Sequence, residues 1–486
     1  MDVIELARWQ FAFTTLFHFI FVPLTIGLSA FVATMQTKWV RTGDEQYLRM
    51  TQFWGKLLLV NFAIGIATGL VQEFQFGMAW SAYSRYVGDV FGAPLAMEGL
   101  GAFFLESTFL GIWIFGWNRL PKKLHLASIW LVFIGTNLSA YFILAANAWM
   151  QSPVGYEIDP VTGNAVLTSI WELLTNPIAI YAYLHTIPAA LTSAAALIVG
   201  ISIWHLGRKP GHETGFFRRS VRWGLRGMLV FALATITVGH FFGQQIAEKQ
   251  PMKMAAAEAL YESRSGAPLS LMAIAPFEKK PERLSFSIEI PKLYSFMETN
   301  DFNGHVEGIN DLQKEYQEKY AQYEIDRGRD PKAAEYYPIV GMTYWSFRTM
   351  VGAGVLMALF AAVGLLIERK KPGGVAAMSR RKWFRCLGFG ALIGGFLAQA
   401  AGWIFTEIGR QPWAVTGLLK TEDAISQLGA STVAISLSVF IVLYVVIGAI
   451  EFWLFRKLAI KGPDPLPDPD DDDESPAKPP LPSLAY

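Results

Sequence analysis

Two histidines, a methionine and a carboxylate stand inside long apolar segments, where polar side chains are uncommon. They are His18, His185, Met350 and Glu407. An ionisable group within hydrocarbon is costly, so each such residue is a candidate for function. Imidazole and thioether are the axial pair of a low-spin haem, whereas a lone imidazole or carboxylate leaves the sixth position of a haem iron open to a gas. These residue types therefore favour haem chemistry.

Zinc is a weaker interpretation of the same residues. A zinc site needs three or four nitrogen or sulfur ligands at close spacing, and the sequence has neither an HxxxH nor an ExxH motif and only one cysteine, Cys386. A single histidine in a membrane helix is more often an interhelical hydrogen-bonding group, and a single methionine is usually packing filler. Each residue alone has this structural alternative, but together they favour haem.

The polar residues of the apolar segments share one depth. Because a helix rises about 1.5 Å per residue, His18, His185 and Met350 all fall in the half of the membrane nearer the N-terminus. Glu98 and Glu106 belong to one further span, the first near its outer end and the second closer to the middle. A random scatter would also populate the other half, so this shared level predicts a common site.

Other charged or titratable residues lie near this level. Arg8 and Arg348 could neutralise haem propionates, which need charge pairing away from water. His240 is also embedded on this side, and nothing in its spacing excludes it as a ligand. Four histidines lie in or beside loops and are expected to be solvated, namely His125, His205, His212 and His305.

The elements that must position these groups are membrane helices. Hydrophobic residues make up 52% of the 486 residues and charged residues only 17%, and the apolar runs reach the roughly 20 residues that cross about 30 Å of hydrocarbon. Backbone polar groups in lipid must be satisfied internally, so the spans are helices. The sequence predicts an all-α polytopic membrane bundle with about nine spans, near residues 10–35, 52–76, 94–117, 125–148, 178–205, 221–243, 339–367, 385–408 and 430–455.

Lysine and arginine in the short loops predict the orientation. Alternate connections are basic, whereas the connection 151–177 has neither residue type. Because basic loops stay in the cytoplasm, we expect the N-terminus outside and the C-terminus in the cytoplasm. The N-terminal segment is acidic and amphipathic, which is untypical of a cleaved signal peptide. The net charge of +1 comes without a basic patch interleaved with aromatic residues, so no nucleic-acid partner is expected.

Four regions follow from the apolar pattern. Residues 1–243 hold the first six spans, and residues 339–460 hold the last three. Between them, residues 244–338 form an outer loop that is long enough to be functional, and residues 310–330 within it are typical of an exposed, highly charged helix. Residues 461–486 are rich in proline and aspartate and should be a disordered cytoplasmic tail.

Several stretches in the expected order resemble subunit I of the cytochrome bd family of quinol oxidases along nearly all of the membrane-embedded length. They are RWQFAFTTLFHFIFVPLTIG, MEGLGAFFLES, NLSAYFILAANAWMQSPVG, YLHT, YWSFRTMVG and WIFTEIGRQPW. The last is the most specific, because residues 409–413, GRQPW, match a family signature.

The resemblance implies a terminal oxidase that reduces dioxygen to water with electrons from a membrane quinol. It implies three haems without copper, namely a low-spin haem b, a high-spin haem b and a haem d. His185 and Met350 would be the axial ligands of the low-spin haem, while His18 and Glu407 would each hold one high-spin haem. Which of these two sites carries haem d is left open.

The resemblance also implies roles for residues around the haems. Arg348 and Trp403 would belong to the haem environment, and the turn containing Arg410 would close the pocket of Glu407 at the outer surface. Lys253 and Glu258 match a pair implicated in quinol oxidation, in a loop of the shorter type. The residues that match polar groups of proton delivery are Glu98, Glu106, Ser139 and Asn147.

By the same resemblance the chain would lie in a bacterial plasma membrane with a second membrane subunit, subunit II, and small single-span subunits as further partners. Protons taken from the cytoplasm and electrons delivered from outside would build a proton motive force without pumping. An ion transporter and a haem-b electron carrier are the alternative functions. A transporter commonly shows paired repeats with broken helices, and a carrier would need two axial ligands on every haem, which Glu407 disfavours.

Overall fold

The computed structural model describes residues 2–208, 213–274 and 286–464; His212 and most of the predicted tail lie outside these ranges. Within them, nine helical spans are long and apolar enough to cross a membrane, which confirms the predicted fold class. The spans are α1 (Val3–Thr42), α2 (Glu45–Met78), α3 (Ser81–Met97) continued by a π-helix (Glu98–Phe103) and α4 (Phe104–Phe115), α5 (Lys122–Gln151), α7 (Pro177–Arg208) preceded by α6 (Ile170–Leu174), α8 (Thr214–Lys249), α13 (Val340–Lys370), α15 (Lys382–Ile408) and α16 (Ala430–Lys461).

Short elements lie between the spans. The helices are α9 (Pro251–Glu258), α10 (Leu293–Thr299), α11 (Ile309–Lys319), α12 (Ala321–Ile325) and α14 (Gly374–Ser379). Four two-stranded antiparallel sheets pair β1 (Tyr156–Ile158) with β2 (Ala165–Leu167), β3 (Arg264–Ser265) with β6 (His305–Val306), β4 (Leu269–Ile274) with β5 (Phe286–Ile290), and β7 (Trp413–Val415) with β8 (Leu419–Lys420).

Local chemistry sets the ends of the first two spans. The Asp2 carboxylate accepts a hydrogen bond from the Glu5 amide (2.7 Å), and Asp44 accepts one from the Gln46 amide (2.9 Å). These caps satisfy amides that have no partner inside the helix. Between the two spans, Gly43 adopts φ +70°, a left-handed conformation that glycine takes without strain. The reversal from α1 to α2 is therefore encoded locally.

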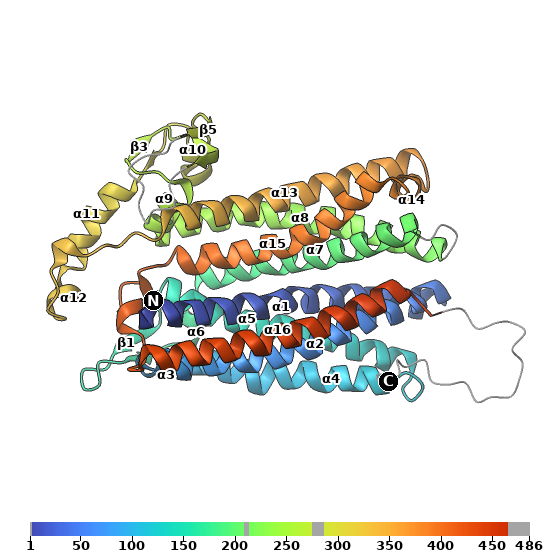
Figure 1. Ribbon diagram of the computed structural model, residues 1–486, viewed down its shortest axis with the longest axis horizontal. Helices are drawn as coiled ribbons and strands as arrows, with labels where there is room; N and C mark the ends of the chain where they lie inside the picture. Colours follow the sequence, from blue (N-terminus) through green and yellow to red (C-terminus); the bar gives the residue numbers. More distant parts are fainter. Residues whose placement is uncertain (1, 209–212, 275–285, 465–486) are drawn as a thin grey trace, which may run out of the picture.

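The long helices form two adjoining groups (Figure 1). In the first, α7 and α13 each pack against both α8 and α15, so these helices make a four-helix group with α7 and α13 at opposite corners. In the second, α1 packs against α2, α5 and α16. Because α1 also packs against α7 and α15, it joins the two groups.

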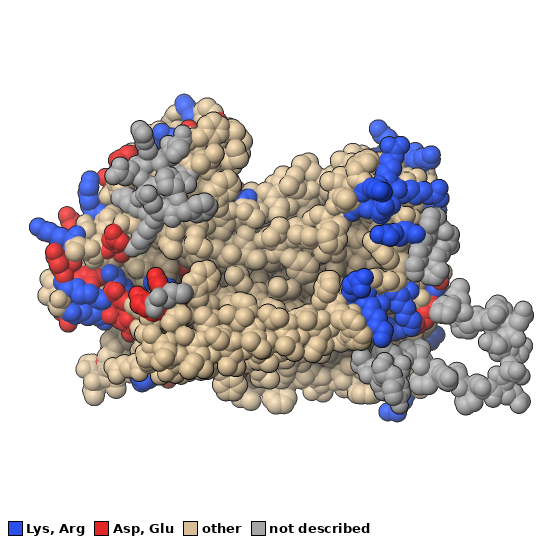
Figure 2. Space-filling view, in the orientation of Figure 1, with Lys and Arg blue, Asp and Glu red and all other residues tan. Residues whose placement is uncertain are grey.

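The two ends of the bundle differ in charge. In Figure 2, lysine and arginine side chains gather at the end that carries α14, which we call the basic end. The opposite end, with α9, α11 and α12, shows acidic and basic side chains together, and we call it the loop end. Exposure of the basic end to the cytoplasm stays a prediction from the loop charges.

Two of the four histidines expected in solvent are buried, so that prediction is wrong for His125 and His205. Nε2 of His125 donates to the Trp113 carbonyl (2.8 Å), and its Nδ1 accepts from the amide of Gln36 (2.9 Å). His205 stacks on an aromatic ring of α8 at 4.0 Å. Buried polar groups are tolerated where they are hydrogen-bonded, and position beside a loop does not reveal such partners. His305 is exposed, as predicted.

The charged segment 310–330 forms α11 and α12, yet it is not solvated on all sides. Ile309, Leu312 and Glu324 are buried. Lys420 pairs with Glu324, and the side chains of this pair are only 6% and 1% exposed. Arg329 adds bonds to Glu324 (2.7 Å) and Asp423 (2.8 Å). Buried ion pairs thus fasten this part of the loop to the segment after α15.

We predict that Glu324→Gln loosens this attachment. Removing one partner of a buried ion pair destabilises by about 3–5 kcal/mol, because the other charge is left unpaired. The variant should therefore be cut faster by a protease within residues 309–338. The matched control is Lys314→Gln, which removes an exposed pair with Asp311 worth about 0–1 kcal/mol. Equal cleavage rates in the two variants would contradict the prediction.

Candidate functional site

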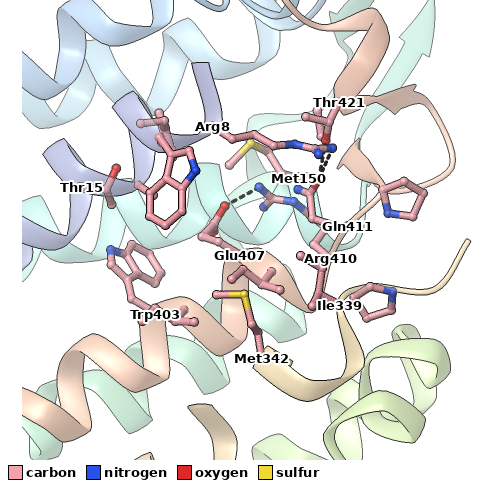
Figure 3. A pocket seen from close by; sticks show the side chains of 18 of the residues that line it. Arg8, Thr15, Met150, Ile339, Met342, Trp403, Glu407, Arg410, Gln411 and Thr421 are labelled. Atoms are coloured by element: carbon pink, nitrogen blue, oxygen red, sulfur yellow. Dashed lines mark hydrogen bonds and ion pairs between the residues drawn. The ribbon is translucent and has the colours of Figure 1, made fainter. Parts of the chain in front are cut away.

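A cavity of about 630 Å³ opens where α1 begins and α15 ends, at the loop end of the bundle (Figure 3). Its volume lies within the roughly 300–1,000 Å³ typical of ligand and cofactor sites. Arg8, Trp403, Glu407 and Arg410 all line it. The structure therefore brings together four of the predicted residues, from α1, α15 and the turn that follows α15.

Glu407 is held from two sides. Asn147 of α5 donates a hydrogen bond to one carboxylate oxygen (2.8 Å), and Arg410 donates to the other (2.5 Å). Arg8 donates to Gln411 across the mouth of the cavity (3.2 Å; Figure 3). The carboxylate is thus fixed by its neighbours before any ligand is considered.

Three buried nitrogen atoms of the cavity residues have no hydrogen-bond partner among the described residues. They are Nη1 of Arg410, Nε1 of Trp403 and Nε1 of Trp80. Buried donors without partners are uncommon in proteins, so such atoms point to a missing acceptor. The propionate oxygens of a haem would satisfy them, and the donor set therefore fits that group.

His18 is oriented by a hydrogen bond to Thr68 of α2. The Thr68 hydroxyl donates its own proton to the Ile64 carbonyl (2.9 Å), so its oxygen accepts the Nδ1 proton of His18 (2.9 Å). The lone pair of the imidazole is then on Nε2. Metal-binding histidines are usually oriented in this way, through a hydrogen bond from the other ring nitrogen.

His185 has the same arrangement within the four-helix group. Its Nδ1 donates to the carbonyl of Thr235 on α8 (3.1 Å), which leaves the lone pair on Nε2. Met350 lies on α13, at the opposite corner of that group. The structure therefore brings these two candidate ligands into one bundle from helices that do not follow each other in sequence.

A glycine lies against each of the three non-carboxylate candidates. An added Cβ at Gly69 would lie 3.1 Å from Cε1 of His18, and one at Gly239 would lie 3.0 Å from Cε1 of His185. At Gly402 it would lie 3.0 Å from the sulfur of Met350. These separations are tighter than ordinary van der Waals contact, so larger residues would displace the side chains.

Glu98 and Glu106 face α5 from the span formed by α3 and α4. Ser139 donates to Glu98 (2.5 Å), and a Cβ at Gly135 would meet Cβ of Glu106 at 2.8 Å. Asn147, the partner of Glu407, lies two turns beyond Ser139 on the same helix. The polar side chains of Ser139 and Asn147 on α5 therefore lie between the level of Glu106 and the cavity.

Lys253 and Glu258, expected at the outer surface, are buried on α9, only 3% and 6% exposed. They contact different helices. Glu258 accepts a hydrogen bond from Arg348 of α13 (2.5 Å). Arg348 precedes Met350 by two residues. Lys253 donates to Gln151 at the end of α5 (2.6 Å).

Lys253 is connected to Glu407 by hydrogen bonds. Gln151, which accepts from Lys253, donates weakly to Asn147 (3.4 Å), and Asn147 donates to Glu407. Burial lowers the pKa of Lys253 well below its usual value, and the nearby Arg410 lowers it further. Burial raises the pKa of Glu258, although Arg348 opposes this. Lys253 and Glu258 of the loop therefore contact the membrane bundle directly, which the sequence did not indicate.

Sequence reasoning missed the residues that orient the candidate ligands. Thr68 and Thr235 act through a hydroxyl and a backbone carbonyl, and threonine is common in membrane helices. It also missed Glu451, a buried carboxylate in α16, although an acid inside an apolar run is a detectable signal. His240 lies on α8 beside Gly239, and its role stays open.

Fold and site together define a polytopic membrane protein with a cavity and buried polar side chains contributed by several helices. Comparison with known proteins specifies the family. The sequence profile of the cytochrome bd terminal oxidase subunit I family matches residues 6–463. The chain belongs to this family. It is a subunit of a haem-containing quinol oxidase and a multi-pass protein of a bacterial plasma membrane, and the transporter and carrier alternatives are set aside.

Relatives match over nearly the whole chain. Cytochrome bd ubiquinol oxidase subunit 1 of Bacillus subtilis (strain 168) is 44% identical, covering 95% of this chain and 94% of the relative. Cytochrome bd-II ubiquinol oxidase subunit 1 of Escherichia coli (strain K12) is 39% identical, covering 95% and 97%. The bd oxidase structure from Geobacillus thermodenitrificans superposes with a TM-score of 0.83 at 28% identity, covering 95% of this chain and 99% of that one.

We predict that Lys253→Met changes the pH dependence of thermal stability. The pKa of Lys253 is lowered in the folded state, so between that value and the unfolded value near 10.5 the unfolded chain binds more protons. Stability of the native protein should therefore rise with pH in this window. The Met variant should lose this rise, measured as the thermal midpoint at neutral pH and at about pH 9.

The control for this measurement is Lys249→Met, which removes an exposed lysine paired with Glu248. It should leave the pH dependence of the wild-type protein unchanged. If the slope were the same in Lys253→Met and in the wild type, the buried amine would not be the group that senses pH.

Proposed function

We propose that this chain carries three haems and performs both quinol oxidation and dioxygen reduction. A low-spin haem b is held by His185 and Met350. Two high-spin haems are held at His18 and at Glu407, one being haem b and the other haem d. Bound haems supply electron transfer from quinol to dioxygen and an open iron position for dioxygen.

One observation carries this assignment. His18 and His185 both give their Nδ1 proton to an oxygen acceptor, so both present Nε2 as a ligand atom. A glycine also lies against Cε1 of each ring, at Gly69 and Gly239. The unpartnered nitrogens of Trp403 and Arg410 add support at the Glu407 site.

Quinol oxidation is assigned to the region of α9. Glu258 is a buried carboxylate with a raised pKa, which suits a group that accepts a quinol proton. Arg348 anchors it to α13, close to Met350. Electrons released at Glu258 would then enter through the low-spin site, and protons would leave at the loop end.

Uptake of the protons that form water is assigned to the basic end of the bundle. Glu106, Glu98 with Ser139, and Asn147 lie in that order from mid-membrane toward Glu407. If the basic end faces the cytoplasm, electrons and protons reach the oxygen site from opposite sides. This separation of charge would generate a proton motive force without a pumping step.

The partners follow from the same reasoning. The family is named as subunit I of an oxidase, which implies a partner subunit. We propose that this partner is the second membrane subunit of the oxidase. Small single-span subunits are a further proposal. Quinol and dioxygen are the substrates, and the quinol loop is of the shorter type.

Gly402→Ala should weaken the sulfur ligand of the low-spin haem. The added Cβ would lie 3.0 Å from the Met350 sulfur, so the methionine must move. We expect part of the low-spin absorption to convert to high spin, measured in reduced-minus-oxidised spectra. Gly390→Ala on the same helix is the control, because nothing lies within 4 Å of its added Cβ. An unchanged low-spin spectrum for Gly402→Ala would remove Met350 as a ligand.

Glu407→Gln should remove one high-spin haem and leave the low-spin haem in place. The amide keeps the size of the side chain but loses the anion, and a metal-bound carboxylate must stay ionised. Haem content per protein and oxygen consumption are the measurements. Glu248→Gln, an exposed acid paired with Lys249, should change neither. A Glu407→Gln protein with all its haem and normal turnover would show that this carboxylate only binds Arg410.

A further inference from the structure

The last span, α16, carries a buried acid on a helix whose other residues are mostly exposed or half-buried in this chain. Only three of its residues are buried, namely Val433, Tyr444 and Glu451. Glu451 is only 7% exposed and forms no ion pair with any residue that the structure describes. A buried carboxyl group on a membrane-spanning helix is costly and is characteristic of ion or proton pathways.

The contacts of α16 locate this acid. It packs against α1 and α2, and Tyr444 donates to the backbone carbonyl of Thr68 on α2 (3.4 Å). The two helices are antiparallel, so Glu451, seven residues further along α16, lies at the level of Asn61, seven residues back along α2. Tyr444 and Glu451 also share a face, because seven residues are close to two helical turns.

Asn61 is the centre of a buried polar group at this level. It is fully buried and donates to the carbonyl of Phe21 (2.8 Å) and to the hydroxyl of Thr25 (2.8 Å), both on α1. Its Oδ1 atom has no partner among the described residues. An unpartnered buried acceptor at the level of a carboxyl group indicates a position for a proton donor or a bridging water.

The polar residues continue from Asn61 toward His18. Thr68, two turns along α2 and also fully buried, accepts from His18. Beyond it, Gln10 of α1 donates to Gln75 of α2 (2.7 Å) and accepts from Ser436 of α16 (2.6 Å). A line of buried polar side chains therefore follows the seam of α1, α2 and α16, and it passes the His18 site.

The charged groups where this seam approaches the basic end already form ion pairs. Lys56, on α2 toward the basic end, forms an ion pair with Asp464. Arg49 pairs with Glu213 (2.7 Å). Among the described residues of α1, α2 and α16, Glu451 is the buried acid, and it has no ion pair.

We propose that Glu451 takes up protons from the basic end and passes them along the α1–α2–α16 seam to the site of His18. This route is separate from the one through Glu106 and Glu98, which lies on α3, α4 and α5. The inference rests on the proposed function, because it needs an oxygen-reducing site at His18.

The chemistry is a proton transfer without change of oxidation state. The Glu451 carboxyl releases a proton toward Asn61, and the resulting carboxylate is reprotonated from the basic end. Reduction of dioxygen to water consumes as many protons as electrons, so the quinol-derived electrons are balanced by protons arriving through the seam and through the route on α5.

The test uses the complete oxidase, with its partner subunit, in liposomes. Glu451→Gln keeps the shape of the side chain but cannot release a proton. We expect normal haem content and spectrum, a several-fold loss of quinol-driven oxygen consumption, slower proton uptake from the basic-end side and a larger solvent isotope effect. Glu451→Asp should restore turnover in part, and Ser438→Ala, on the exposed face of α16, should match the wild type.

The outcomes separate the proposal from its alternatives. Normal oxygen consumption and proton uptake in Glu451→Gln would overturn it. Equal losses in the Gln and Asp variants together with loss of haem would also overturn it, because the side chain would then be a packing element. Glu106→Gln, measured in parallel, reports on the other route, so failure of the proposed function would appear there and in the haem content of Glu407→Gln.

Discussion

The organisation of the loop end depends on one carboxylate held between an amide and a guanidinium. Asn147 and Arg410 bind the two oxygens of Glu407, and these three residues come from α5, from α15 and from the turn after α15. A charge inside a membrane bundle must be compensated locally. Placing Glu407 there therefore requires α5, α15 and the following turn to meet, and their meeting forms one side of the cavity, which α1 also lines.

The short helix α9 also carries buried charged residues, and they connect it to two parts of the bundle. Its Lys253 reaches the Glu407 end of the site through Gln151 and Asn147, while its Glu258 is bound to Arg348 near Met350. The two charges lie five residues apart in sequence and engage different helices. One turn-and-a-half of helix thus connects the loop to both proposed haem regions, so displacement of α9 would be felt at each.

Much of the fold could be predicted because membrane helices are long, apolar and continuous. His18, His185 and Glu407 could be selected as candidates for the same reason, since an ionisable group stands out in an apolar run. Gly402 could not, because its importance lies in the distance to Met350, which no local pattern records. Glu324 was expected to be solvated because a charged helix on its own is solvated, whereas Lys420, distant in sequence, makes its burial tolerable.

The π-helix Glu98–Phe103 between α3 and α4 changes the direction in which the side chains on either side of it point around the helix axis. In an uninterrupted α-helix, residues eight apart are displaced by about 80° around the axis, at about 100° per residue. The wider turn of a π-helix absorbs an extra residue, and Glu98 and Glu106 both face α5, at Ser139 and Gly135. If the same residues adopted α-helical winding, the two acids would be displaced by about 80° and one carboxyl group would turn away from α5. The alignment of the two acids is therefore a property of the backbone, and no substitution of side chains could replace it.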